Sequence, residues 1–171
     1  MPKIIENART MLLDEARRQV SERGYAGTTV RSVAAACGLA CGTVYNYFES
    51  KDMLIASFVA DDWIKCTAAL RLSPAADAKE LMRQIYDMLV AFSLSHQTLF
   101  TDPDAAKTFN SIFSQRHSQL RRQIAEMIIP ALPEGDDRDF VADFIAEAIL
   151  TWTTAGRSFD EIFRIIEKII K

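Results

Sequence analysis

The stretch from residue 28 to residue 54 contains two short apolar patterns separated by Gly38, and it constrains the fold more than any other part of the chain. The hydroxyls of Thr28 and Thr29, before the first pattern, suit a helix N-cap. Gly38 suits a helix end, because glycine readily adopts the left-handed conformation that closes a helix. On both sides of it, apolar residues recur at the three- and four-residue steps of a helix. They are Val30, Val33, Ala34 and Cys37 before Gly38, and Val44 and Phe48 after it. Leu39 is expected to pack between the two helices.

The second segment, residues 40–48, is predicted to be a short helix that is kept folded by its neighbours. It spans about two turns, and an isolated helix of that length is unstable in water. Val44 and Phe48 lie four residues apart on one face, which leaves the opposite face free. Two short helices joined at a sharp turn, with the second one exposed, form a helix-turn-helix, whose second helix enters the major groove of DNA.

The free face of this segment carries side chains that suit DNA. Hydroxyl groups donate to phosphate oxygens, an asparagine pairs with a base edge, and cations at either end attract the DNA backbone. Ser50 is expected to cap the helix that follows. The candidate DNA-binding residues from this pattern are Arg31, Thr43, Tyr45, Asn46, Tyr47 and Lys51.

These residues resemble the N-terminal domain of the tetracycline-repressor (TetR) family of bacterial transcription regulators. The family's run Gly-Thr-Leu-Tyr-x-x-Phe-x-Ser-Lys-x-x-Leu stands here as GTVYNYFESKDML, from Gly42 to Leu54, and the resemblance covers residues 5–60. It implies a homodimer that binds a palindromic operator and releases it when a small molecule enters the C-terminal domain. Ala40 and Cys41 depart from the family, which often has a serine and a polar or basic residue there. The resemblance implies DNA contacts at Thr29, Arg31, Thr43, Tyr45, Tyr47 and Lys51, with Asn46 as a specificity residue.

The net charge of −3 is unevenly distributed along the chain, in the direction that DNA binding requires. Residues 1–51 carry seven Lys and Arg against five Asp and Glu, whereas the rest of the chain carries thirteen against eighteen. Because the excess is small, we expect DNA affinity to fall steeply above about 0.1 M salt. No run of about twenty apolar residues is free of charge and the N-terminus lacks a signal-peptide layout, so we expect a soluble, cytoplasmic protein.

Helical periodicity, scarce glycine and the lack of strand alternation predict an all-α fold. We expect an N-terminal three-helix DNA-binding domain over residues 1–50 and a C-terminal helical ligand-binding and dimerisation domain over residues 51–171. Gly24 is expected to stop the first helix, and Asp102-Pro103 to start a later one. The expected helices span residues 4–23, 30–37, 40–48, 50–72, 76–96, 103–129, 137–155 and 159–171.

The last two expected helices carry wide apolar stripes. One interpretation is that both stripes are buried within a single chain. The other is that part of them pairs with a second copy in a four-helix bundle of the kind the family uses. Two recognition helices about 34 Å apart would then read successive major grooves. The stripes comprise Phe140, Val141, Phe144, Ile145, Ala148, Ile149 and Trp152 in one helix, and Phe159, Ile162, Phe163, Ile166, Ile169 and Ile170 in the other.

A small apolar or amphipathic effector is expected to bind, if at all, in an apolar pocket of the C-terminal domain. An aromatic stripe at helical spacing is also typical of an ordinary core, and both interpretations stay open at this point. The candidate lining residues are Trp63, Met88, Phe92, His96, Phe100, Phe109, Phe113 and Trp152.

The competing class is a helical enzyme or metal-binding protein that contains a helix-turn-helix-like corner. The chain has no Glu-x-x-His spacing, no phosphate-binding glycine loop and no nucleophile beside a histidine, so we expect no enzymatic activity, cofactor or metal. His96 and His117 are interpreted as surface or hydrogen-bonded residues. Cys37, Cys41 and Cys66 are an odd number and are interpreted as small packing residues, with redox or metal sensing by the first two as the alternative.

Overall fold

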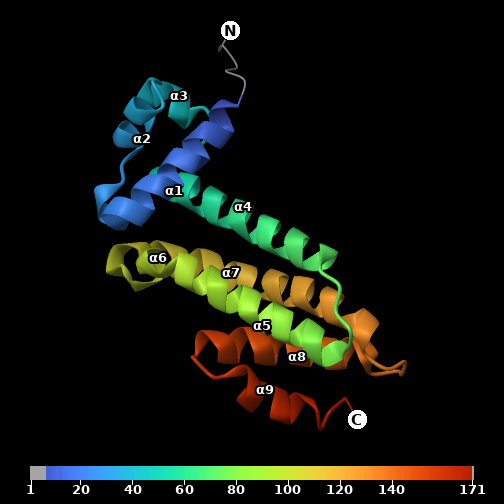
Figure 1. The fold of residues 1–171 in the computed structure, drawn as a ribbon. Coiled ribbons are helices and arrows are strands. Elements are labelled where there is room, and N and C mark those ends of the chain that lie inside the picture. The colour runs from blue at the N-terminus through green and yellow to red at the C-terminus, as the bar shows by residue number, and fades with distance from the viewer. Residues whose placement is uncertain (1–6, 171) are drawn as a thin grey trace. The chain divides into compact units, whose positions relative to one another are not determined.

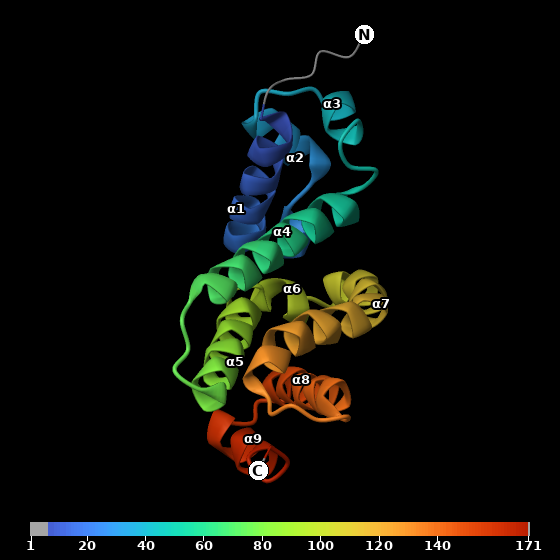
Figure 2. The same ribbon diagram turned by 90° about the vertical axis from the view of Figure 1, so that its right-hand side faces the viewer.

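The structure is a computed structural model that describes residues 7–170, except the side chains of residues 108–116. Every regular element in this part of the chain is a helix, which confirms the predicted all-α class (Figures 1 and 2). The helices are α1 (Ala8–Gly27), α2 (Val30–Ala36), α3 (Cys41–Tyr45), α4 (Lys51–Leu72), α5 (Ala78–Ser95), α6 (Gln97–Thr101), α7 (Pro103–Ile128), the short 3-10 helix η1 (Ile129–Ala131), α8 (Arg138–Thr154) and α9 (Phe159–Ile166).

The chain divides into two compact units. The first unit contains the chain up to Ile64 and a second segment, His96–Ser111. The second unit contains Lys65–Ser95 and the chain from Ile112 onward. The helix-turn-helix and α6 therefore belong to the first unit, whereas α5, α8 and α9 belong to the second. Helices α4 and α7 each contribute residues to both.

Helix α1 packs against α2 and α6 within the first unit. Its apolar stripe is buried at Ala8, Leu12, Ala16 and Val20, as the four-residue spacing predicts. Gly24 has a positive φ of 72° and interrupts the helical backbone, but one further turn follows and the element ends at Gly27. Glycine tolerates this conformation because it has no Cβ. Gly24 therefore kinks the helix, whereas it was expected to end it.

The short helix α6, which the sequence pattern did not predict, is held in the first unit by buried side chains. Leu99 and His96 are 2% and 5% exposed. The Nε2 atom of His96 lies 3.2 Å from Oδ2 of Asp62 on α4, and its ring stacks on Phe58. Asp62 also accepts hydrogen bonds from Nε and Nη2 of Arg17 on α1, at 3.0 and 2.7 Å. One carboxylate therefore connects α6 and α4 to α1.

Helix α8 packs against α5 and α9 in the second unit, and α9 also packs against α5. Ser158 begins α9 with a capping box, in which its side chain accepts a hydrogen bond from the Glu161 backbone. The hydroxyl of Tyr86 on α5 donates to the carbonyl of Arg157 at 3.0 Å and so fixes the loop before α9. The core consists mainly of branched aliphatic residues. Its fully buried members include Met82, Ile85, Ile124, Ile128, Ile145, Ile149 and Ile166.

Other helix ends also differ from the sequence prediction. Helix α3 ends at Tyr45, three residues before the expected residue 48. Helix α5 begins at Ala78, two residues later than expected, because Oδ1 of Asp77 accepts a hydrogen bond from the backbone N–H of Glu80 at 2.8 Å and acts as its cap. Helix α9 ends at Ile166, short of the expected residue 171. Beyond it the backbone forms tighter turns, such as the 3.1 Å bond from Lys168 N–H to the Ile165 carbonyl.

Candidate nucleic-acid interface

The start of α2 is fixed by a reciprocal cap that is anchored to α1. The Oγ1 atom of Thr29 accepts a hydrogen bond from the Ser32 backbone at 3.0 Å, and Oγ of Ser32 accepts one from the Thr29 backbone at 3.1 Å. The Ser32 hydroxyl donates to Oε1 of Gln19 at 2.6 Å. Gln19 is 1% exposed, and its amide donates to Glu15 at 2.7 Å. Gln19 was not among the predicted functional residues, although a polar residue beside the buried stripe of α1 was a usable signal.

The turn between α2 and α3 has the geometry expected from its glycine. Gly38 has φ of 67°, in the left-handed region. Its backbone N–H donates to the carbonyl of Ala35 at 3.1 Å, and the N–H of Leu39 donates to the carbonyl of Ala34 at 2.8 Å. These bonds satisfy the last carbonyls of α2 and set the direction in which the chain enters α3.

Helix α3 is anchored through one face only. Val44 is 0% and Phe48 5% exposed, which confirms the predicted packing face. The Thr43 N–H donates to the Ala40 carbonyl at 2.9 Å, and the Phe48 N–H donates to the Val44 carbonyl at 3.0 Å. Since α3 spans only Cys41–Tyr45 and packs on α2, tertiary contacts hold this short helix in place.

The remaining side chains of α3 and its flanks are open to the surroundings. Tyr45 is 54% exposed, and Asn46 and Arg31 are also exposed. Thr29 is exposed at the start of α2, although its hydroxyl is used in the cap. Thr43 and Tyr47 are half-buried.

Lys51 is bound more closely to the protein than its place in the motif indicates. Its Nζ atom donates to the backbone carbonyl of Tyr25 at 3.1 Å and lies 3.5 Å from the centre of the Tyr25 ring. The Tyr25 hydroxyl donates to the carboxylate of Asp52. Tyr25 thus connects the end of α1 to the first turn of α4, a role that the sequence analysis did not identify. A phosphate contact by Lys51 stays a prediction.

Most cations in the middle of α1 are neutralised within the helix. Nη1 of Arg17 lies 2.6 Å from Oδ1 of Asp14. Nη2 of Arg18 lies 2.6 Å from Oε1 of Glu15, and its Nη1 lies 2.7 Å from Oε2 of Glu22. Hydrogen bonds from Arg18 and then Gln19 lower the pKa of Glu15 from 4.5 to about 2. The other cations of this region form no ion pair within residues 7–170 and so keep their full charge. In the helix-turn-helix part of the first unit and the start of α4 these are Arg9, Arg23, Arg31 and Lys51.

The residues that were expected to line an effector pocket are divided between the two units. Trp63 and His96 are buried in the first unit and Phe100 is partly exposed there. Phe92 is buried and Met88 half-buried on α5 of the second unit. Trp152, also in the second unit, is 49% exposed. Phe109 and Phe113 lie outside the described side chains. Lining of a pocket by these residues stays a prediction.

The histidines and cysteines show no arrangement that points to chemistry. His96 is hydrogen-bonded to Asp62, and Nε2 of His117 lies 2.9 Å from Oε2 of Glu147. Burial raises the pKa of the Cys37 thiol, which disfavours the reactive thiolate. Among the side chains that the structure describes, no three His, Cys, Asp or Glu residues are grouped so that they could hold a metal ion. None of the helices within residues 7–170 is both long and apolar enough to cross a membrane.

Comparison with known proteins places the chain among bacterial regulators. Residues 12–58 match the family described as bacterial regulatory proteins, tetR family. The chain is 31% identical over 148 residues to the HTH-type transcriptional repressor KstR2 of Rhodococcus jostii (strain RHA1), a match that covers 81% of this chain and 71% of that protein. It is 33% identical over 95 residues to the HTH-type transcriptional repressor Rv1474c of Mycobacterium tuberculosis (strain ATCC 25618 / H37Rv), covering 53% of this chain but only 48%, about half, of that protein.

The likeness extends to the fold outside the helix-turn-helix. A crystal structure of a TetR-family transcriptional regulator, ECA1819, from Pectobacterium atrosepticum superposes with a TM-score of 0.65 at 24% identity. The superposition covers 99% of this chain and 93% of that one. The likeness of fold therefore includes the helices after α4.

Proposed function

This chain belongs to the tetR family of bacterial regulatory proteins, which are transcriptional regulators and not enzymes, and we propose that it binds palindromic operator DNA as a homodimer and is released by a small-molecule inducer. The observation that carries the proposal is the two-sided character of α3, which is buried at Val44 and open at Tyr45. We assign DNA binding to residues 1–50, and dimerisation and effector binding to residues 51–171.

The recognition step is proposed to place the open side of α3 in the major groove. The amide of Asn46 would pair with a base edge, and the hydroxyls of Thr43, Tyr45 and Tyr47 would donate to phosphates. Arg31 adds positive charge at the start of α2. Since Val44, Phe48 and the Thr29–Ser32 cap already fix the backbone, binding would require little rearrangement of these helices.

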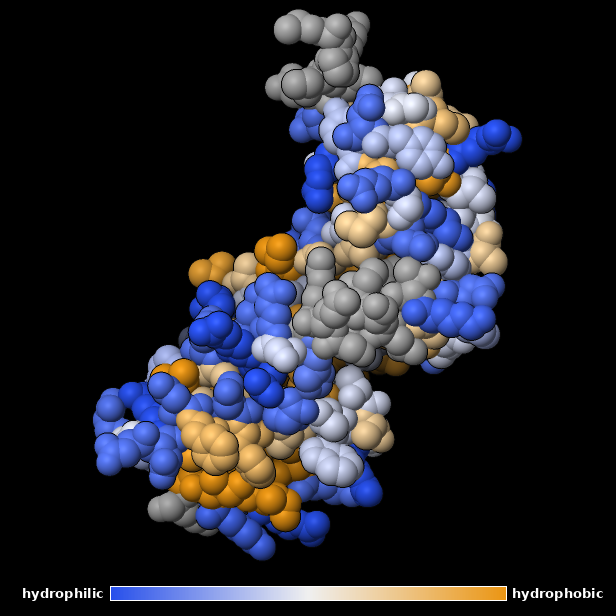
Figure 3. All heavy atoms as spheres, turned by 180° about the vertical axis from the view of Figure 1, so that it is seen from behind, coloured by the Kyte–Doolittle hydropathy of each residue, from blue (hydrophilic) through white to orange (hydrophobic). Residues whose placement is uncertain are grey.

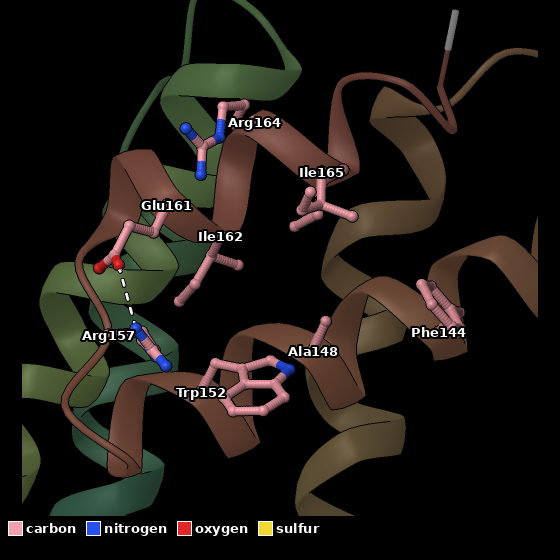
Figure 4. Close-up of a pocket in the computed structure, with 9 residues that line it drawn as sticks. Phe144, Ala148, Trp152, Arg157, Glu161, Ile162, Arg164 and Ile165 are labelled. Carbon is pink, nitrogen blue, oxygen red and sulfur yellow. Dashed lines mark hydrogen bonds and ion pairs between the residues drawn. The ribbon is translucent and has the colours of Figure 1, made fainter.

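The second copy is proposed to cover a face that α8 and α9 present. Phe144 and Trp152 of α8 are each 49% exposed, and Ile165 of α9 is 53% exposed. Figure 4 shows these side chains around a groove between the two helices, with the 3.2 Å ion pair of Arg157 and Glu161 at one edge. Strongly hydrophobic colours also gather over this part of the second unit in Figure 3. A contiguous apolar face of this kind is typical of a surface that a partner covers.

A dimer would also bind DNA more tightly than a single chain. The excess of two positive charges in residues 1–51 supports only a weak electrostatic attraction by one chain. A dimer presents two α3 helices to successive major grooves, about 34 Å apart, and doubles every contact. A symmetric protein then selects a palindromic site, because each half-site meets the same residues.

Release by an inducer is proposed to work as a population shift. Helix α4 begins at Lys51, six residues after the end of α3, and runs to Leu72 without a helix-breaking residue. A change in its tilt would therefore move α3 directly. An effector that favours the tilt in which the two α3 helices no longer match successive grooves lowers DNA affinity by its difference in affinity for the two states.

Selection of bound duplexes from a random DNA pool at low salt tests the proposal. We expect inverted repeats whose half-sites lie about one helical turn, 10 base pairs, or a multiple of it apart. Asn46→Ala should retain the spacing but relax the preference at one position of each half-site. Binding without any sequence preference, or recovery of single half-sites only, would contradict the proposed dimeric recognition.

A further inference from the structure

Arg9 is an exposed residue in the first turn of α1, and its guanidinium packs on Phe48, three residues after the end of α3. Its guanidinium carbon lies 5.6 Å from the centre of the Phe48 ring. Phe48 is 5% exposed and its backbone N–H bonds to Val44 of α3. Figure 1 shows the N-terminal end of α1 beside α3. The guanidinium is therefore placed next to the helix-turn-helix surface although it comes from another helix.

Arg9 forms no ion pair within residues 7–170, unlike Arg17 and Arg18 further along α1. Arg17 and Arg18 each make charged hydrogen bonds to carboxylates of their own helix. Arg9 forms no ion pair or hydrogen bond with any residue in the range 7–170. A guanidinium that rests on an aromatic ring is oriented by the ring and keeps its five N–H donors for another partner.

Resting on the function proposed above, we propose that Arg9 binds a phosphate of the operator backbone next to the end of α3. A phosphate fits better than a base, because Arg9 extends from α1 and not from the face of α3 that would enter the groove. The planar fork of guanidinium N–H groups matches a phosphate and binds it through two bonds. Helix α1 thereby contributes directly to the DNA interface, in addition to supporting α2 and α3.

Salt dependence of DNA binding tests this assignment. Each phosphate contact lowers the slope of log affinity against log salt by about 0.9, so Arg9→Gln in both subunits should make the slope shallower by about 1.8. Between about 0.05 and 0.2 M salt, the affinity advantage of the wild-type protein over Arg9→Gln should shrink about twelvefold. The loss should be the same for the selected site and for point variants of it, because a phosphate contact reads no sequence.

Two further variants make the test specific. Arg23→Gln removes the same charge from an exposed site about 21 Å away along α1, and it should leave the slope unchanged. Arg9→Lys keeps the charge and should keep most of the slope. All three variants should melt like the wild-type protein, which shows that a changed slope does not come from unfolding.

The possible failures are distinguishable. A wild-type slope in Arg9→Gln, or equal shallowing in Arg9→Gln and Arg23→Gln, would overturn the phosphate contact while leaving the DNA-binding function intact. A changed base preference in Arg9→Gln would also overturn it, in favour of a base contact. A wild-type protein that selects no DNA sequence would instead refute the proposed function on which the inference rests.

Discussion

The hydroxyl of Ser32 donates a 2.6 Å hydrogen bond to the buried side-chain oxygen of Gln19, and this bond connects the capped start of α2 to the middle of α1. Both ends of the Gln19 amide are used, because its nitrogen donates to Glu15 at 2.7 Å. A buried amide is stable only while its partners remain. The orientation of α2, and with it that of α3, therefore depends on a residue outside the helix-turn-helix.

Gln19→Ala should destabilise the protein by about 2 kcal/mol, because it removes buried atoms together with the hydrogen bonds of the amide to Ser32 and Glu15. Urea unfolding at neutral pH measures the change. Gln119→Ala, at an exposed position on α7, is the matched control and should change stability by less than about 0.5 kcal/mol. Equal effects in the two variants would show that the Gln19 contacts contribute nothing to stability.

Acid sensitivity is expected at Glu15. Its pKa is about 2 in the folded protein, below the ordinary value of 4.5, because Arg18 and Gln19 hydrogen-bond the ionised form. The ionised carboxylate therefore stabilises the fold fully above about pH 4.5, and this contribution disappears as the pH falls through about 2. Glu15→Gln should flatten the fall in unfolding free energy over this range in a pH series of urea titrations. For Glu49→Gln, a change at an exposed position, the unfolding free energy should fall with pH as steeply as it does for wild type. An equally steep fall for Glu15→Gln would contradict the prediction.

Lys51 and Tyr45 should separate folding from DNA binding. Lys51→Ala removes the contacts of the amine with the Tyr25 carbonyl and ring, so it should cost about 1 kcal/mol of stability as well as DNA affinity. Tyr45→Ala should weaken binding of the selected duplex without lowering the melting temperature, because its side chain is 54% exposed. Lys107→Ala, at an exposed site, serves as the neutral control. Calorimetry and fluorescence anisotropy measure the two effects, and a destabilised Tyr45→Ala protein would place Tyr45 in the core.

Trp152→Glu should dissociate the proposed dimer. A carboxylate in an apolar interface loses its hydration without gaining a partner, so we expect the dimer dissociation constant to rise at least about 100-fold. Sedimentation equilibrium measures it, and operator affinity should fall in parallel. Leu94→Glu places the same charge at a 64%-exposed position on α5 and should leave the dimer intact. A Trp152→Glu protein that remains dimeric would move the interface away from this face.

Features whose causes lie within a few residues were predictable from the sequence. The cap at Thr29 and the turn at Gly38 depend on neighbours a few residues away, and the four-residue spacing of Val44 and Phe48 indicates which face of the segment is buried. Asp102 likewise caps α7, where its Oδ1 accepts a hydrogen bond from the Ala105 backbone at 3.0 Å. Local hydrogen bonds and helical spacing determine these features, and both are visible in the order of residues.

Features that depend on distant partners were not predictable. Helix α6 has five residues and no side-chain cap, and it depends on the contact of His96 with Asp62, 34 positions earlier. Lys51 was assigned to DNA because of its place in the motif, but its amine also contacts Tyr25, 26 positions earlier. Since neither pairing follows from a local pattern, only the folded chain reveals it.

The return of the chain to its first unit at His96 limits how this protein can be cut and recombined. A gene fusion that carries only the segment up to Ile64 would discard α6 and leave Asp62 without its histidine and α1 without the helix that covers it. Such a fragment is expected to expose apolar surface and to aggregate. The first unit is therefore not encoded by one continuous stretch of the gene. A chimaeric regulator that contains this unit would need both stretches.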